Sequence, residues 1–180
     1  RLALALVEHS DRAKADMDAT INISYEKLSN LLAPEMEAVS KLINQRMASD
    51  HAPRIPKITA HLTQAGGKRL RPLLTLAAAR LCGYAGEDHI RLAATVEFIH
   101  TATLLHDDVV DGSDQRRGRP TANLLWDNKS SVLVGDYLFS RSFQLMVETG
   151  SLQVLDVLAN ASATIAEGEV LQLTTVGNID

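Results

Sequence analysis

Residues 88–111 read DHIRLAATVEFIHTATLLHDDVVD, and this stretch decides the fold class of the chain. It contains no Gly or Pro and lacks the alternation of apolar and polar residues that marks a strand, so it predicts one long helix. Glu87 and Asp88 suit the start of that helix, because acidic side chains are favoured in a first turn. Gly112 directly after the stretch is typical of a helix end.

The sequence on both sides of this stretch also predicts helices. Met36, Val39, Ile43 and Met47 follow helical spacing, and the prolines within residues 49–56 end that helix. Further helices are expected over residues 55–62, 73–81, 129–147 and 152–176. Residues 73–81 are apolar nearly all round, which indicates a buried helix, whereas residues 112–121 are polar and basic and predict a loop. No strand pattern is present, so we expect an all-α bundle with short connections.

Composition limits the classes of protein to which the chain can belong. Its 180 residues and 19.6 kDa correspond to one domain, in which residues 1–20 form a charged lead-in and residues 21–180 the helical part. The net charge of -4 argues against nucleic-acid binding through bulk charge. The single Cys82 excludes an internal disulfide and fits a reducing compartment. No apolar run approaches the roughly 18 residues that span a membrane.

The end of the long helix is unusually acidic. Asp107, Asp108 and Asp111 fall in its last turn, where the helix dipole disfavours negative charge. Asp107 and Asp111 are also four residues apart, which places two like charges on one face. A hard divalent cation between these carboxylates would explain the pattern, and a set of oxygen ligands favours magnesium over zinc. The alternative interpretation is a solvated acidic helix end.

Basic residues accompany this acidic turn on both sides. Arg116 and Arg117 follow it in the loop, and arginine forks match the oxygens of phosphates. Lys68 and Arg71 follow Gly66-Gly67 at a helix start, where backbone amides also favour an anion. His100 lies two turns before Asp107 on the same helix stripe. Together they outline a site for diphosphate and magnesium, although solvated basic residues and a core histidine are the alternatives.

Five motifs in order resemble the trans-isoprenyl diphosphate synthases, in particular the long-chain polyprenyl diphosphate synthases. They are GGKRLRP at 66–72, EFIHTATLLHDDVVD at 97–111, DQRRGRPT at 114–121, LVGDYLFSRSF at 133–143 and EGEVLQL at 167–173. The resemblance extends from about Tyr25 to the C-terminus. It implies a helical bundle of the isoprenoid synthase type around a deep cavity, a homodimer and a cytoplasmic enzyme.

The resemblance also implies a reaction. These enzymes join an allylic diphosphate, such as a farnesyl-type primer, to isopentenyl diphosphate in repeated 1'-4 condensations that depend on Mg2+. Carried onto this chain, Asp107 and Asp111 would bind the metal on the allylic diphosphate, with Asp108 as a supporting carboxylate and Arg116 on the same diphosphate. Isopentenyl diphosphate would be held by four residues: Lys68, Arg71, His100 and Arg117.

Product length can be argued from the same helix. Ala102 and Thr103 lie one turn before Asp107 and are small, where short-chain members of the family place bulky aromatics. We therefore expect a long product, in the octaprenyl to decaprenyl range, which suits the side chain of a quinone such as ubiquinone. Such a lipophilic product would bring the enzyme into transient contact with membranes. Simple helix packing is the alternative role for Ala102.

The sequence departs from the family in length. Family members are nearly twice as long and carry a second aspartate-rich motif, whereas the only aspartates here after Asp136 are Asp156 and Asp180. We therefore expect the sequence to be the N-terminal half of a synthase, truncated and alone weakly active or inactive. The alternatives are an inactive fragment or non-catalytic helical subunit that retains diphosphate binding, and a class I terpene cyclase, against which GGKRLRP speaks.

Overall fold

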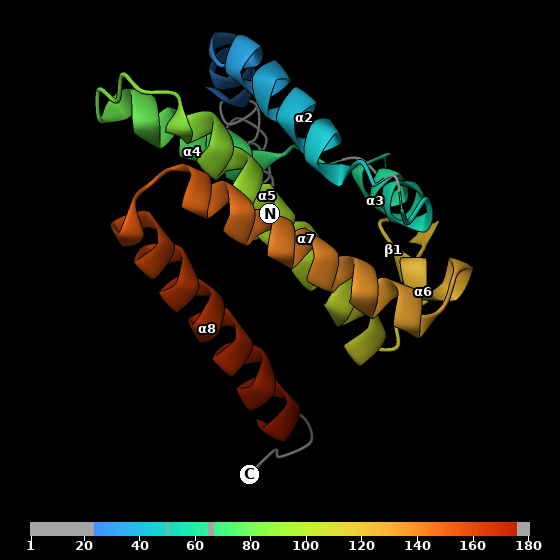
Figure 1. Cartoon of the computed structure of the whole chain (residues 1–180). Helices are drawn as coiled ribbons and strands as arrows, with labels where there is room; N and C mark the ends of the chain where they lie inside the picture. The colour runs from blue at the N-terminus through green and yellow to red at the C-terminus, as the bar shows by residue number, and fades with distance from the viewer. Residues whose placement is uncertain (1–23, 50, 65–66, 176–180) are drawn as a thin grey trace, which may run out of the picture.

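The computed structural model describes residues 24–49, 51–64 and 67–175, and the predicted lead-in of residues 1–20 lies outside these ranges. The described part is all-α apart from one small hairpin, which confirms the predicted class (Figure 1). After a helical segment at 24–31, the elements are α2 (Ala33–Met47), α3 (Arg54–Gln64), α4 (Leu70–Leu81), α5 (Asp88–Val110), β1 (Gln115–Arg116), β2 (Arg119–Pro120), α6 (Ala122–Leu125), α7 (Asn128–Glu148) and α8 (Leu152–Thr175). None of the described helices is both long and apolar enough to cross a membrane.

Helix α5 is the centre of the fold. It packs along α7 on one side and against α4 and α2 on the other, and Phe98 and Leu105 of α5 are fully buried in the core. The contact with α7 is close at Gly135, where an added Cβ would lie 2.3 Å from Nε2 of His106. A glycine at this point therefore leaves room for the ring of His106 near the acidic end of α5.

Helix α4 is less buried than its sequence predicts. Leu73 and Leu76 are buried against the core, but Leu74 is 60% and Leu81 89% exposed, so the prediction of a buried helix is wrong. The helix lies at the edge of the described bundle and packs only through the face toward α5 and α2. Helix α8 has no buried residue and diverges from α7 beyond their connection (Figure 1).

The expected loop at 112–121 contains a hairpin, which corrects the prediction that no strand is present. Arg116 of β1 pairs with Arg119 of β2, and the two residues between them, Arg117 and Gly118, have φ of 53° and 74°. Two consecutive positive φ values are typical of the type I′ turns that connect tight hairpins. Strands of two residues are too short to show an alternating pattern, so periodicity could not reveal them.

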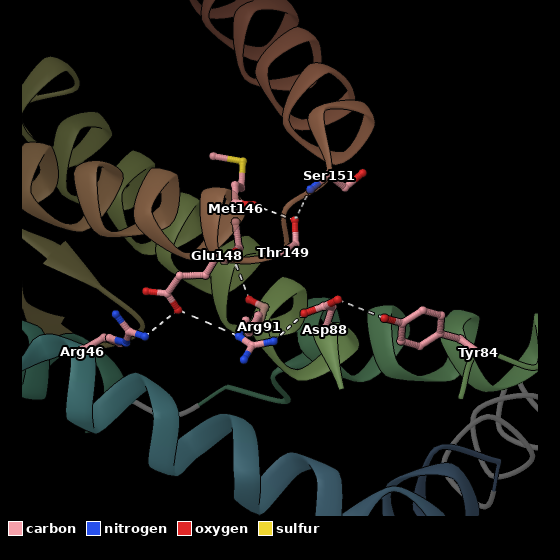
Figure 2. A network of polar contacts seen from close by, with 9 residues as sticks. Arg46, Tyr84, Asp88, Arg91, Met146, Glu148, Thr149 and Ser151 are labelled. Atoms are coloured by element: carbon pink, nitrogen blue, oxygen red, sulfur yellow. Dashed lines mark hydrogen bonds and ion pairs between the residues drawn. The ribbon is translucent and has the colours of Figure 1, made fainter. Parts of the chain in front are cut away.

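A polar network joins α2, α5 and α7 at the end of the bundle away from the acidic turn (Figure 2). Glu148 accepts a hydrogen bond from Nη2 of Arg46 at 2.6 Å and lies 3.9 Å from Nε of Arg91. Arg91 also pairs with Asp88 in the first turn of α5. One carboxylate thus links three helices that are far apart in the sequence.

We expect Glu148→Gln to lower the free energy of unfolding by about 0.5–1 kcal/mol, because these half-exposed pairs are partly screened by water. Urea denaturation followed by circular dichroism measures this change. Glu167→Gln, at an exposed position of α8, is the matched control. Equal stability of the two variants would contradict a role for the network.

Candidate functional site

A cavity of about 380 Å³ opens where the loop before α4, the middle of α5 and the turn of the hairpin meet. Its apolar walls come from α3, α4 and α5, including Leu62 and Leu104. Its charged and titratable lining comprises Lys68, Arg69, Arg71, Glu97, His100 and Arg117. The four residues that the sequence predicts to bind isopentenyl diphosphate therefore all line one cavity, although the first and the last are 49 positions apart in the sequence.

Arg71 and His100 touch across the cavity. Nη1 of Arg71 donates to Nε2 of His100 at 3.0 Å. A guanidinium can only donate, so Nε2 is the acceptor and the ring proton is on Nδ1. Burial and the nearby Arg71, Arg117 and Arg116 lower the pKa of His100 to about 4. The ring is therefore neutral at pH 7, and the positive charge of the cavity comes from its lysine and arginines.

The low pKa of His100 predicts a pH dependence of stability. Between pH 6.5 and about 4 the unfolded chain binds a proton that the native ring does not, so His100 makes native stability fall as the pH drops through this window. We expect the unfolding midpoint of wild type to fall more than that of His100→Gln between pH 6.5 and 4.5, measured by thermal denaturation. The carboxylates titrate in both proteins, so their contributions to the change in unfolding midpoint cancel in this comparison.

The exposed His51 provides the control for this prediction. His51→Gln should keep the full pH dependence of wild type. A parallel fall of stability in wild type and His100→Gln would contradict a neutral His100 in the native cavity.

The loop that carries Lys68 is fixed by the N-terminal helices. The hydroxyl of Tyr25 donates to the carbonyl of Lys68 at 2.9 Å, and Nζ of Lys68 lies 5.4 Å from the centre of the Tyr25 ring. Arg69 has a φ of 43° and donates from Nη1 to Oγ of Ser40 at 2.7 Å. An added Cβ at Gly67 would lie 2.6 Å from Nη1 of Arg117, so the loop passes close to the end of that side chain where it meets the hairpin.

Glu97 is a cavity residue that the sequence analysis missed. Burial raises its pKa, although the charges of Arg69, Arg71 and Arg117 oppose the shift. A carboxylate among these arginines balances part of their charge. Its position three residues before His100, on the same helix face, is the signal that could have identified it.

The three aspartates at the end of α5 have different surroundings. Asp107 is half-buried, Asp111 is exposed at the helix C-cap, and Asp108 is fully buried. Burial and the negative charge of Glu169 raise the pKa of Asp107, against the opposing effect of Arg116. Negative charge therefore accumulates around Asp107, which a cation would relieve.

The donor set suits magnesium. Asp107 and Asp111 offer only oxygen, and within the described ranges no group of three or more His, Cys, Asp or Glu is spaced to hold a metal. A magnesium ion bound by two carboxylates normally keeps several waters and takes further oxygens from a phosphate. The residues present thus fit a metal that arrives together with a diphosphate.

Asp108, unlike Asp107 and Asp111, is withdrawn from solvent. Its Oδ1 accepts a hydrogen bond from Nε of Arg116 at 2.9 Å, and its carboxylate is 0% exposed. Arg116 was predicted to bind the allylic diphosphate; it lies beside the aspartates as expected, but it is already tied to one of them.

The two residues predicted to control product length differ in how deeply they are buried. Ala102 is 1% exposed and belongs to the hydrophobic core, so it packs between helices rather than lining an open face. Thr103 is half-buried, and its hydroxyl donates to the carbonyl of His100. Of the two, Thr103 is the one with access to space beside α5.

Comparisons with known proteins identify the family of the chain. Residues 52–180 match the family model described as polyprenyl synthetase. The octaprenyl diphosphate synthase of Escherichia coli (strain K12) is 49% identical over 158 residues, which cover 88% of this chain and 49% of the relative. The chain therefore spans about half the length of the curated relatives it matches.

Solved structures of polyprenyl diphosphate synthases also resemble this chain. The crystal structure of a decaprenyl diphosphate synthase from Rhodobacter capsulatus is 74% identical with a TM-score of 0.82, over 84% of this chain and 46% of the other. A second crystal structure is that of a polyprenyl synthase from Caulobacter crescentus CB15 complexed with calcium and isoprenyl diphosphate. It is 58% identical to this chain with a TM-score of 0.80, and the match covers 83% of this chain and 45% of the other. The predicted isoprenoid synthase type of helical fold is confirmed by these neighbours.

Proposed function

Because this chain belongs to the polyprenyl synthetase family, we propose that it carries the isopentenyl diphosphate site and the first aspartate-rich site of a long-chain trans-polyprenyl diphosphate synthase. The convergence of Lys68, Arg71, His100 and Arg117 on one cavity is the observation that carries the proposal. Four residues predicted from separate motifs to bind the same diphosphate share one site, beside the aspartates at the end of α5.

The proposed reaction breaks the C1–O bond of the allylic diphosphate. The double bond of isopentenyl diphosphate then attacks the allylic carbon, a new carbon–carbon bond forms, and the proton lost in the last step goes to the departing diphosphate. Magnesium, when bound by Asp107 and Asp111, would absorb the negative charge that develops on this leaving group. Electrostatic stabilisation of this kind is often the largest contribution to catalysis.

The residues of the chain supply binding and position. Lys68, Arg71 and Arg117 would hold isopentenyl diphosphate by its oxygens, so that its double bond lies next to the allylic carbon, and this alignment lowers the barrier. Nε2 of His100 accepts from Arg71, so the ring can donate to a phosphate oxygen only if Nε2 gains a proton or the ring turns so that Nδ1 donates. No side-chain base is required.

We also propose the finer properties implied by the family. The product would be an octaprenyl- to decaprenyl-length diphosphate for a quinone side chain such as that of ubiquinone, made from a farnesyl-type primer by a homodimeric enzyme. Relatives named octaprenyl and decaprenyl diphosphate synthases support the length. The calcium in the Caulobacter neighbour supports a divalent cation as cofactor.

Incorporation of labelled isopentenyl diphosphate tests the proposal. The assay uses farnesyl diphosphate and Mg2+ with two proteins: this chain, and a chimaera in which it replaces the matching segment of the Escherichia coli octaprenyl diphosphate synthase, 49% identical to it. We expect the chimaera to form long polyprenyl diphosphates. An inactive but folded chimaera that binds no inorganic diphosphate would overturn the proposal.

In the same chimaera, Thr103→Phe is expected to shorten the main product by several isoprene units, because an aromatic ring would close the space beside α5. Thin-layer analysis of the dephosphorylated products measures the length. Ala102→Phe is the contrasting variant: it should mainly destabilise the fold, by about 1–3 kcal/mol, because it overpacks the core. Unchanged product length in Thr103→Phe would contradict the role of this position.

A further inference from the structure

The hairpin that carries Arg117 is closed at its base. The hydroxyl of Thr121 donates to the carbonyl of Ser113 at 2.7 Å, and the amide of Thr121 donates to the carbonyl of Asp114 at 3.1 Å. These contacts tie the end of β2 to the segment that follows α5. They act on one side of the hairpin only, so its position relative to α3 depends on a further contact.

Helix α3 supplies that contact, and it lies next to the hairpin and α6 (Figure 1). Nε2 of His61, in the last turn of α3, lies 2.8 Å from the carbonyl oxygen of Pro120 in β2. A carbonyl can only accept, so Nε2 carries the proton and donates it. This single side chain therefore joins the end of α3 to the hairpin, across 59 positions of sequence.

The ring of His61 is held in place by Trp126, directly after α6. The centres of the two rings lie 5.6 Å apart and their planes meet at 75°, which is an edge-to-face contact. Aromatic pairs favour this geometry over face-to-face stacking. The contact limits rotation of the imidazole and keeps Nε2 directed at Pro120.

His61 lies behind the wall of the cavity. Its neighbour Leu62 lines the cavity, whereas His61 lines a smaller space beside it that Pro120 and Arg117 also border. A bound diphosphate would therefore touch Arg117 but not His61. Any effect of His61 on binding must pass through the hairpin.

The hairpin amplifies small movements at its base. Arg117 lies three residues before Pro120, which at about 3.3 Å per residue gives a lever of about 10 Å. A small rotation about the base would displace Arg117 by about 1 Å, a distance that matters for the alignment of bound groups. Helix α3 ends at Gln64, four positions before Lys68, so the same helix also leads into the second basic segment of the cavity.

We propose that His61 is a positioning residue for the isopentenyl diphosphate site. By donating to the carbonyl of Pro120, it fixes the hairpin relative to α3 and thereby sets the position of Arg117 in the cavity. This role rests on the proposed function. Arg116 is held separately by its ion pair with Asp108, so the inference concerns isopentenyl diphosphate and not the allylic substrate.

Isothermal titration calorimetry of isopentenyl diphosphate into this chain, with EDTA present, tests the inference. EDTA removes divalent cations, so that metal-dependent binding at the aspartates does not contribute. His61→Phe keeps a ring beside Trp126 but cannot donate a hydrogen bond. We expect it to weaken binding about tenfold, the upper end of what one neutral hydrogen bond contributes to an equilibrium. His61→Gln retains an N–H donor at a similar reach and should bind within threefold of wild type.

A double variant tests whether the effect passes through Arg117. In the Arg117→Gln background the arginine that the hairpin positions is gone. His61→Phe should then change the affinity for isopentenyl diphosphate less than twofold. A role confined to stability would not depend on the residue at position 117.

Tyr137→Phe is the matched control. The hydroxyl of Tyr137 donates to the carbonyl of Ala48 at 3.2 Å, so this variant also keeps a ring and removes a hydrogen bond to a backbone carbonyl, away from the cavity. It should leave the affinity unchanged. Thermal denaturation of every variant gives the fraction folded at the titration temperature, so that affinities are compared between folded proteins.

Each outcome decides between the possibilities. Weakening by His61→Phe that His61→Gln restores, and that disappears in the Arg117→Gln background, supports the inference. Unchanged binding in His61→Phe would overturn it, as would equal weakening in both backgrounds or equal weakening by His61→Gln. Failure of the wild-type chain itself to bind isopentenyl diphosphate would overturn the proposed function, and the inference with it.

Discussion

Replacement of both Asp107 and Asp111 by alanine is expected to lower prenyl transfer by the chimaera by about 1,000-fold or more. Metal ions commonly contribute several kcal/mol to stabilisation of a charged transition state, and these two carboxylates are the proposed magnesium ligands. The leaving diphosphate would otherwise develop its charge beside Glu169 without a cation to balance it. Initial rates with labelled isopentenyl diphosphate at saturating Mg2+ measure the loss.

Asp114→Ala is the matched control, because Asp114 is exposed and only three residues beyond Asp111. It should retain nearly full activity. The folded structure should survive the double replacement, since Asp111 is exposed and Asp107 only half-buried. Activity of the double variant within tenfold of wild type would show that the metal is bound elsewhere.

Arg71→Gln is expected to raise the KM for isopentenyl diphosphate by about 100-fold, while the KM for the allylic diphosphate changes little. A hydrogen bond to a charged group contributes about 1.5–3 kcal/mol, and Arg71 can make more than one to a diphosphate. The variant also removes the guanidinium from which Nε2 of His100 accepts a hydrogen bond. Steady-state kinetics of the chimaera, with each substrate varied in turn, separate the two sites.

Arg80→Gln is the matched control, because it makes the same substitution elsewhere on α4. Arg80 lies near the other end of α4 and pairs with Glu35, away from the cavity. Its variant should keep both KM values within twofold of wild type. An equal rise of KM for both substrates in Arg71→Gln would contradict a cavity specific for isopentenyl diphosphate.

Most of the helices and of the candidate site could be predicted from the sequence because the signals are local. The absence of Gly and Pro in residues 88–111 and the glycine after them predict α5 nearly to its last residue. Lys68, Arg71, His100 and Arg117 were identified through motifs, and the structure brings them to one cavity. Glu97 begins the motif at 97–111, but it was missed because only the fold brings it beside Arg69, Arg71 and Arg117.

Other features depended on neighbours that are distant in the sequence. The apolar pattern of α4 suggested burial, but the described chain covers only one of its faces. Ala102 was small enough to line a cavity or to fill a core, and packing against neighbouring helices places it in the core. The hairpin depends on two positive φ values and on its attachment to α5, neither of which leaves a periodic signal.

The sequence by itself therefore determined the helices, the acidic turn and the identity of the basic residues, because helix periodicity and helix-end signals act over a few residues. Only the tertiary structure decided which of the three aspartates in the acidic turn is buried. Successive residues on a helix point about 100° apart, so the packing of the hairpin against α5 buries Asp108 on Arg116 and leaves Asp107 and Asp111 accessible. The division of one DDxxD run into two proposed metal ligands and one buried anchor follows from that packing.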